Sequence, residues 1–303
     1  GCALSSRGDE AEMARFQREF PDAARRLEER FAHVKGSCLL QTQGKGKRES
    51  DTRPSTIDEA DFAIDHGNEK LTLRRMPSPT GKGPHSPLVE FVYCVSKNSD
   101  FSLVRPPGAA AYTVEEVGTR AMQGSAYTQF FGRFVRAHQG VMMQTMSQVM
   151  SGPGFLLKDA ERVTEDGRSL VKIHYEAGRE EPKNQGSVVL DPDGGWVVRS
   201  SEFRPGAAPK MRFTANVTYE PTGADGILLP RRVIIRGPTD ESSCEYTNWS
   251  FEPTPIAEFG MPFYGLPDLT ARVEKRWSTL PYWLAGLAVA GVGLAFVLKR
   301  LSR

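Results

Sequence analysis

Apolar residues near the start of the chain repeat every three or four positions. On an α-helix over residues 9–34, one face would carry Phe16, Phe20, Ala23, Leu27 and Phe31. Arginine and glutamate fill the other face, as is typical of an amphipathic helix packed on a core. Pro21 lies inside this range and is expected to kink or divide the helix. Residues 1–8 before it are expected to be disordered.

After this helix the hydrophobic period falls from 3.6 to 2, which indicates β-strands. A first run of segments covers residues 33–43, 57–66, 69–75, 88–95, 101–104 and 112–117. Two polar stretches interrupt it and are predicted to be exposed loops, residues 44–56 and 76–87. A second run covers residues 156–163, 169–175, 187–191, 196–204, 212–220, 227–235 and 242–252. The short turns between these segments favour antiparallel neighbours.

A second long helix is predicted between the two runs, over residues 120–150, because apolar residues again recur at helical spacing. Methionine and phenylalanine on it offer a deformable surface that suits acyl chains and hydrophobic peptides. The residues expected to line a ligand cavity are Phe130, Phe131, Phe134, Met142 and Met146. A helix that simply fills the sheet would show the same pattern. His138 lies on the apolar stripe and is expected to be a core residue with satisfied hydrogen bonds.

About a dozen strands are too many for a flat sheet, which would curl. Helices and strands do not alternate along the chain, so a parallel sheet is not expected. The predicted fold class is α+β, mainly antiparallel β. In this fold, residues 9–252 form an unclosed half-barrel, and the two helices pack on its concave side.

The end of the chain has a different pattern. Residues 280–298 carry no charge, and a basic tail, residues 299–303, follows at once. As a helix, this segment would span roughly 28 Å, close to the hydrocarbon thickness of a bilayer. We predict a transmembrane helix here, a linker over residues 253–279 before it, and a cytoplasmic tail. The anchoring residues would be Tyr282, Trp283, Leu284, Leu287, Leu294, Phe296, Lys299 and Arg300.

Two features leave the arrangement at the membrane open. Small residues four positions apart, such as Gly286 and Ala290, could let a second helix pack closely and so allow self-association. The chain starts with Gly1 and Cys2 rather than methionine, so an export signal could precede it, and Cys2 could then carry a lipid. With such a signal the body lies outside the cytoplasmic membrane, which we expect. Without one, the body would be cytoplasmic.

Composition and motifs exclude several functions. The chain has 39 basic and 37 acidic residues, so it lacks the charge of a nucleic-acid-binding protein. Motifs of metalloproteases, serine hydrolases and phosphate-binding loops are absent, so no enzyme activity and no cofactor are predicted. The five histidines are scattered, and no metal site is predicted from their spacing, although folding could gather them. Cys38, Cys94 and Cys244 are expected to be buried thiols, and an exported body could bond two of them.

A family resemblance rests on four sequence stretches. These are DGRSLVKIHY (166–175), GSVVLDPDGGWVVRSSEF (186–203), YEPTGADGILLPRRVII (219–235) and EFGMPFYGLPDL (258–269). The first three follow the rhythm of hairpins and Asp-Gly turns of the outer-membrane lipoprotein carrier superfamily, and the fourth resembles a segment of its C-terminally anchored bacterial variants. The resemblance implies an unclosed antiparallel barrel with helices on its concave side. A tethered body, however, cannot diffuse as a soluble carrier must.

Together these patterns predict a non-enzymatic, membrane-anchored binding or sensing module. Its curved sheet would hold a lipid, an acyl chain or a hydrophobic peptide. The alternative is a structural or interaction protein of the cell envelope, with a filled interior and loops 44–56 and 76–87 that bind a partner. A hydrolase built from dispersed Asp, Glu or His residues is a third hypothesis.

Overall fold

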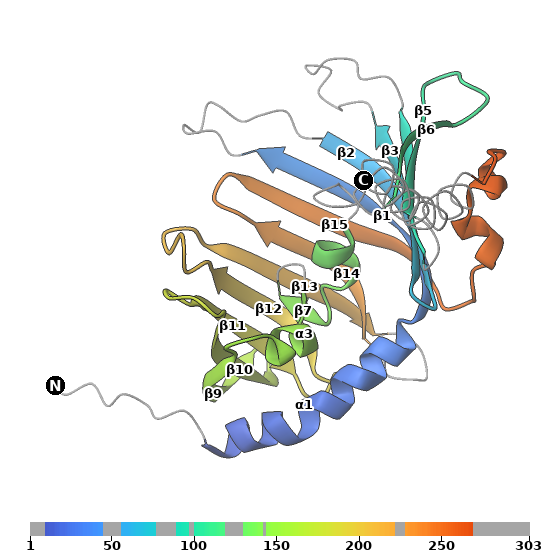
Figure 1. Cartoon of the computed structure of the whole chain (residues 1–303). Coiled ribbons are helices and arrows are strands. Elements are labelled where there is room, and N and C mark those ends of the chain that lie inside the picture. Colours follow the sequence, from blue (N-terminus) through green and yellow to red (C-terminus); the bar gives the residue numbers. More distant parts are fainter. Residues whose placement is uncertain are drawn as a thin grey trace, which may run out of the picture.

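The computed structural model describes residues 10–44, 56–76, 89–96, 100–118, 130–141, 144–221 and 228–268. Within these ranges, 13 strands form one antiparallel sheet (Figure 1). The first group consists of β1 (His33–Gly44), β2 (Thr56–Asp65), β3 (Asn68–Met76), β4 (Glu90–Val95), β5 (Asp100–Arg105) and β6 (Thr113–Val117). The second consists of β9 (Leu156–Glu165), β10 (Arg168–Ala177), β11 (Asn184–Asp191), β12 (Val197–Arg204), β13 (Phe213–Pro221), β14 (Leu228–Arg236) and β15 (Asp240–Ser250).

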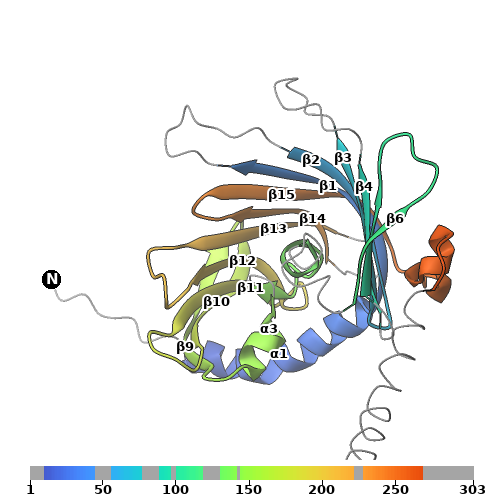
Figure 2. The same ribbon diagram turned by 45° about the horizontal axis from the view of Figure 1, so that its top comes forward.

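Each group is a meander in chain order, and the two meanders join through β1 and β15. The strand order is β6-β5-β4-β3-β2-β1-β15-β14-β13-β12-β11-β10-β9, so β6 and β9 are unpaired edges in the described part of the chain. Figure 2 shows the sheet curving around the helical elements without closing. The mainly antiparallel, unclosed sheet predicted from the sequence is therefore confirmed.

Tight turns hold the hairpins in register. His66 and Gly67 connect β2 to β3 with φ values of 49° and 82°, and Asp166 and Gly167 connect β9 to β10 with φ values of 50° and 74°. Two consecutive positive φ angles characterise the turn type that matches the right-handed twist of paired strands. Glycine adopts such angles without steric cost, which explains why it takes the second position in both turns.

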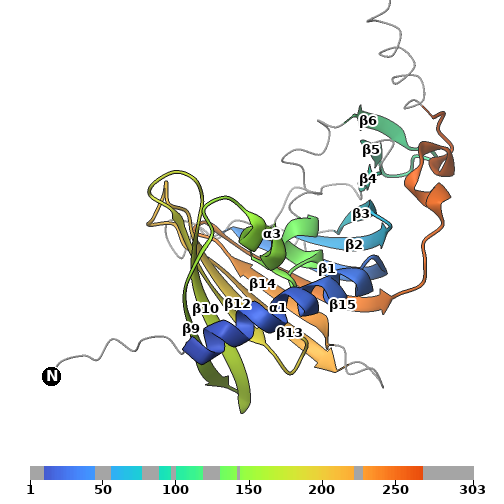
Figure 3. The ribbon, with the colours of Figure 1, turned by 60° about the horizontal axis from the view of Figure 1, so that its bottom comes forward.

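Helix α1 (Glu10–Arg30) lies across the concave side of the sheet (Figure 3). Its apolar face enters a core cluster with strands β9–β12, and Phe16 and Phe20 pack there against Trp196. The helix is continuous, so the division expected at Pro21 is not observed. Pro21 lies on the exposed side, where water can satisfy the carbonyl group that loses its hydrogen bond.

The prediction of one long second helix over residues 120–150 is wrong in the part of this segment that the structure describes. Here a single π-helical turn, η2 (Phe131–Val135), leads into the two short paired strands β7 (Gly140–Val141) and β8 (Gln144–Thr145). A new helix, α3 (Met146–Ser151), then begins. The apolar stripe is thereby split, since η2 packs on one core cluster and α3 on another.

Local chemistry explains the break. The Thr145 side chain accepts a hydrogen bond from the Gln148 backbone N–H at 3.2 Å, and the Gln148 side chain accepts one from the Thr145 N–H at 2.9 Å. This capping box starts α3 at a defined residue. A Cβ atom on Gly140 would lie 2.3 Å from the Gln144 carbonyl oxygen, so the close approach within the β7–β8 hairpin requires glycine.

Residues after β15 pack on the opposite face of the sheet. Two short 3-10 helices, η3 (Ile256–Phe259) and η4 (Met261–Tyr264), bring Met261 into a buried cluster with side chains of β4 and β5. The first part of the predicted linker, up to residue 268, is thus attached to the sheet. The predicted span 280–298, its anchoring residues and the basic tail lie outside the described residues and stay predictions. Among the helices that the structure does describe, none has the length and apolar character needed to cross a bilayer.

Replacing Gly36 by alanine is expected to destabilise the fold by about 1–3 kcal/mol. Gly36 lies in β1, at the junction of the two meanders, and a Cβ there would approach the Asn248 carbonyl oxygen to 2.6 Å and the Phe62 ring to 2.7 Å. The midpoint of urea unfolding measures the effect. Gln41→Ala, at an exposed position of the same strand, serves as the control and should leave the midpoint unchanged. Equal midpoints for both variants would contradict this prediction.

Candidate functional site

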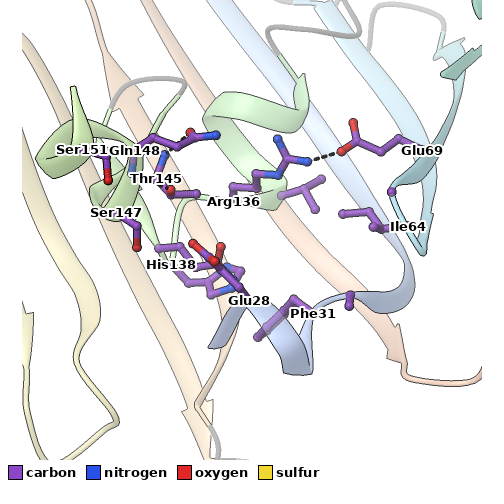
Figure 4. Close-up of a pocket in the computed structure, with 14 residues that line it drawn as sticks. Glu28, Phe31, Ile64, Glu69, Arg136, His138, Thr145, Ser147, Gln148 and Ser151 are labelled. Atoms are coloured by element: carbon purple, nitrogen blue, oxygen red, sulfur yellow. Dashed lines mark hydrogen bonds and ion pairs between the residues drawn. The ribbon is translucent and has the colours of Figure 1, made fainter. Parts of the chain in front are cut away.

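A cavity of about 500 Å³ lies between the end of α1, the β2–β3 hairpin and the segment from η2 to α3 (Figure 4). Its volume falls within the range of small-molecule sites. The lining residues are Glu28, Phe31, Ala32, Ile64, Gly67, Glu69, Val135, Arg136, His138, Gln139, Thr145, Ser147, Gln148 and Ser151. They come from three parts of the chain that are far apart in sequence.

Backbone hydrogen bonds hold these walls together. The His66 N–H donates to the Ala32 carbonyl at 3.3 Å, which ties the β2–β3 hairpin to the end of α1. The Val198 N–H donates to the His138 carbonyl at 3.0 Å, which ties the middle segment to β12. The positions of the cavity walls are therefore fixed by the backbone of the folded chain.

An ion pair joins the middle segment to the sheet at the cavity. Arg136 follows η2, and its guanidinium donates to the carboxylate of Glu69 in β3, as Figure 4 shows. The Glu69 side chain is mostly buried, whereas that of Arg136 is about one-third exposed. This pair bridges two walls and places opposite charges beside the cavity without leaving either charge alone.

His138 is the most unusual residue of the lining. Its exposed fraction is 1%, and its ring packs on Phe31 with 3.9 Å between ring centroids. Neither ring nitrogen makes a hydrogen bond of ordinary geometry. Burial lowers the His138 pKa to about 3; a contact with the Val135 backbone opposes this shift, and the Arg136 charge adds to it.

The chemistry that His138 can offer follows from this environment. With so low a pKa the imidazole is neutral at pH 7, so one nitrogen is a donor and the other an acceptor. A buried polar group without a partner costs about 1–3 kcal/mol. A ligand that brings a neutral polar group, such as a hydroxyl, an amide or an ester carbonyl, would recover this free energy.

The remaining lining is amphipathic. Phe31, Ile64 and Val135 give the cavity an apolar side, whereas the residues around α3 contribute hydroxyl and amide groups. Figure 4 shows the polar side chains of Thr145, Ser147 and Gln148 on the α3 side. Such a lining suits a ligand with one apolar part and one polar, uncharged part.

The described residues that the sequence pattern selected belong to core clusters and not to the lining of this cavity. Phe130, Phe131 and Phe134 are buried in the cluster between η2 and strands of both meanders. Met146 is buried in the cluster under α1, and Met142 lies outside the described residues. His138 is buried as expected, but its hydrogen bonds are not satisfied. The position of His138 on an otherwise apolar stripe was the sequence signal that could have identified it as a candidate site residue.

The three described cysteines are buried free thiols, as one of the two sequence interpretations predicted. Burial raises the pKa of Cys94 to about 12, and it also raises the pKa of Cys244. Because a thiol with a raised pKa is protonated at neutral pH, neither group is an activated nucleophile.

Comparison with known proteins gives structural likenesses only. No family model and no curated protein sequence matches the chain. A Vibrio parahaemolyticus domain with the provisional name outer membrane lipoprotein-sorting protein has 9% identity and a TM-score of 0.45, with 81% of this chain and 97% of that chain covered.

Two structures of MucB complexes also match. MucB in complex with MucA(peri) has 12% identity and a TM-score of 0.22, with 77% of this chain and 99% of that chain covered. The Pseudomonas aeruginosa MucA/MucB complex has 12% identity and a TM-score of 0.23, with 77% of this chain and 100% of that chain covered. All these TM-scores are below 0.5, so the likenesses assign neither a function nor a site residue to this chain.

Proposed function

We propose that this protein is a non-enzymatic binding module that holds a lipid or another acyl-chain ligand on the concave side of its sheet. The apolar part of the ligand would contact Phe31, Ile64 and Val135, and its neutral polar group would hydrogen-bond with His138. The observation that carries this proposal is the buried imidazole of His138, which faces a cavity and has no hydrogen-bond partner of ordinary geometry. The resemblance of the strand and turn sequences to lipoprotein carriers supports the same class of ligand.

The place of action is part of this proposal. Residues 280–298 would anchor the chain in the cytoplasmic membrane, with the body outside and the basic tail inside. An anchor of this kind keeps the cavity close to a source of lipids. The ligand would then be received or sensed at the membrane surface rather than carried away from it.

Displacement of a fluorescent fatty-acid methyl ester, whose polar group is an uncharged ester, tests binding. A fragment of residues 1–268 is suitable, because ending the chain before Met261 would remove a buried side chain from the core. We expect saturable binding, and we expect His138→Leu to weaken it about tenfold, because a hydrogen bond worth roughly 1–1.5 kcal/mol is lost. His174→Leu, at a partly exposed histidine of β10 outside the lining of this cavity, is the matched control and should bind as the unmodified fragment does.

Two outcomes would count against the proposal. If the folded fragment shows no saturable binding, the cavity is not a lipid site. If His138→Leu and His174→Leu bind the probe equally well, the ligand does not contact His138. Circular dichroism spectra of all three proteins must agree for either conclusion to stand.

A second function is favoured by the filling of the concave side. Apart from the cavity, the clusters under η2 and α1 pack this side densely with buried apolar side chains. Such a body could instead present its surface to a partner protein at the cell envelope. Loops 44–56 and 76–87 are the proposed contact segments, although nearly all of their residues lie outside the described ranges. Cross-linking in membranes, followed by pull-down with and without these loops, separates this function from lipid binding.

A further inference from the structure

Two histidines and an aspartate meet at the start of β1 and the end of β2. His33 and Asp65 are direct partners in the β1–β2 register, and Nδ1 of His33 contacts Oδ1 of Asp65. The rings of His33 and His66 are perpendicular, with 4.1 Å between their centroids. Each of the three residues can present one donor atom within 4.8 Å of the other two. This group is distinct from the lining of the cavity.

The backbone around this group is well fixed. The His66 N–H donates to the Ala32 carbonyl at 3.3 Å, and the Asn68 side-chain amide donates to the Asp65 carbonyl at 2.9 Å. His33 and Asp65 are held on paired strands, whereas His66 is exposed on the turn. Two donors are therefore preformed, and the third can adjust by rotating its side chain.

The charge of Asp65 is also informative. Its side chain is 10% exposed, and a carboxylate buried to this extent normally has a cationic partner. Elsewhere on these strands such pairs are present: Lys35 of β1 pairs with Glu252, and Asp61 of β2 pairs with Arg74 of β3. Among the described residues, no lysine or arginine forms an ion pair with Asp65, and the side chain that contacts its carboxylate is His33.

We propose that His33, Asp65 and His66 bind a divalent transition-metal ion of the zinc class. Two imidazoles and one carboxylate, with a fourth position open to solvent at His66, are a donor set that zinc uses in proteins. Magnesium and calcium prefer sites made only of oxygen atoms. Metal–ligand distances of about 2.0–2.2 Å require donors roughly 3.4 Å apart. His33 Nδ1 and Asp65 Oδ1, which are in direct contact, must therefore move apart slightly, whereas donors up to 4.8 Å apart must approach each other. The ion would replace the direct contact between His33 and Asp65.

The position of the site indicates what the ion would do. Ala32 and Gly67, which flank His33 and His66 in the sequence, both line the cavity. A bound ion would therefore clamp the junction of α1 and β1 to the β2–β3 hairpin at one wall of the cavity. This role is structural and does not depend on the proposed lipid binding.

Titration with Zn²⁺ and with Co²⁺ tests the site. The full chain is used in a nonionic detergent, without a polyhistidine tag and with Cys2→Ser, so that neither a tag nor that thiol contributes ligands. Isothermal calorimetry is expected to show one Zn²⁺ per chain, and Co²⁺ is expected to develop a visible absorption band. Excess Zn²⁺ should raise the melting temperature, because a ligand that binds only the folded state stabilises it.

The variants are chosen to keep the fold intact. His66→Asn retains a residue that tolerates a positive φ angle, and His33→Gln retains a polar side chain on β1. Each is expected to weaken Zn²⁺ binding at least tenfold and to reduce the shift in melting temperature. His174→Asn removes a partly exposed histidine that also lies beside a carboxylate, that of Glu161, and it should bind Zn²⁺ as the starting protein does.

The proposal is overturned if the starting protein binds no Zn²⁺ at a one-to-one ratio. It is equally overturned if His66→Asn, His33→Gln and His174→Asn bind with the same affinity. Melting temperatures measured in the presence of a chelator show whether each variant is folded. If one ligand variant has a lower melting temperature than the starting protein in the presence of chelator, its loss of Zn²⁺ binding is not used. The Co²⁺ spectrum of the other ligand variant then tests the site.

Discussion

Replacing Phe16 by alanine is expected to lower the free energy of unfolding by about 3–5 kcal/mol. Phe16 has an exposed fraction of 0% and lies between Phe20 and Trp196, with ring centroids 4.9 Å and 5.8 Å away. Alanine would remove these aromatic contacts and leave a cavity where α1 packs on β9–β12. Because α1 also supplies one wall of the candidate site, loss of this contact should weaken ligand binding as well.

Urea unfolding, followed by circular dichroism, measures this effect. Arg18→Ala is the matched control, because Arg18 is in the same helix and its side chain is 73% exposed. That variant should change the free energy of unfolding by no more than about 0.5 kcal/mol. A loss of less than 1 kcal/mol in Phe16→Ala would show that α1 is not held to the sheet by its apolar face.

Acidification from pH 7 to pH 5 is expected to cost about 2 kcal/mol of stability through His138 alone. The His138 pKa is about 3 in the folded protein, whereas the ordinary value is 6.5. Between these two values the unfolded chain binds a proton that the folded protein does not bind. The free energy of unfolding therefore falls as the pH drops below about 6.5, and this loss is complete near pH 3.

Replacement of His138 by leucine separates this effect from the titration of other groups. The variant should lose the His138 contribution, so its stability should fall less between pH 7 and pH 5 than that of the original protein. At pH 7 it should be as stable or up to about 1–3 kcal/mol more stable, because an unpaired buried polar group is removed. If His138→Leu shows the original dependence, His138 is protonated or hydrogen-bonded in the folded state.

A stabilising substitution that weakens binding would be a specific sign of function. Residues retained for packing alone lose stability when they are replaced, whereas binding residues can be replaced with a gain in stability. The cavity proposal predicts this second behaviour for His138. For Phe16, whose contribution to binding is indirect, it predicts that replacement lowers the stability of the protein.

The sequence by itself was sufficient for the strands and for α1. Every predicted strand is present with its bounds shifted by only a few residues, and α1 spans Glu10–Arg30 within the predicted range 9–34. These features could be predicted because alternation and helical spacing are local, and a curved sheet needs one apolar face along each strand. The Asp-Gly and His-Gly turns are local signals of the same kind.

The break in the middle segment was hidden by the same local signals. Phe130, Phe134 and Val149 fit one helical stripe, and two short helical elements joined by a hairpin satisfy that spacing equally well. The capping box at Thr145 decides where α3 begins. Since core clusters accept apolar residues from either arrangement, periodicity alone could not distinguish them.

Only the tertiary structure decided how distant segments meet. Lys35 of β1 pairs with Ser250 of β15, and this contact joins the two meanders. The cavity at His138, and the group of His33, Asp65 and His66, also depend on chain segments that fold together. Hydrophobic pattern specifies which face of each strand is buried, but it does not specify which strand lies beside it. That choice depends on packing and backbone hydrogen bonds summed over the whole sheet, which no local window of sequence contains.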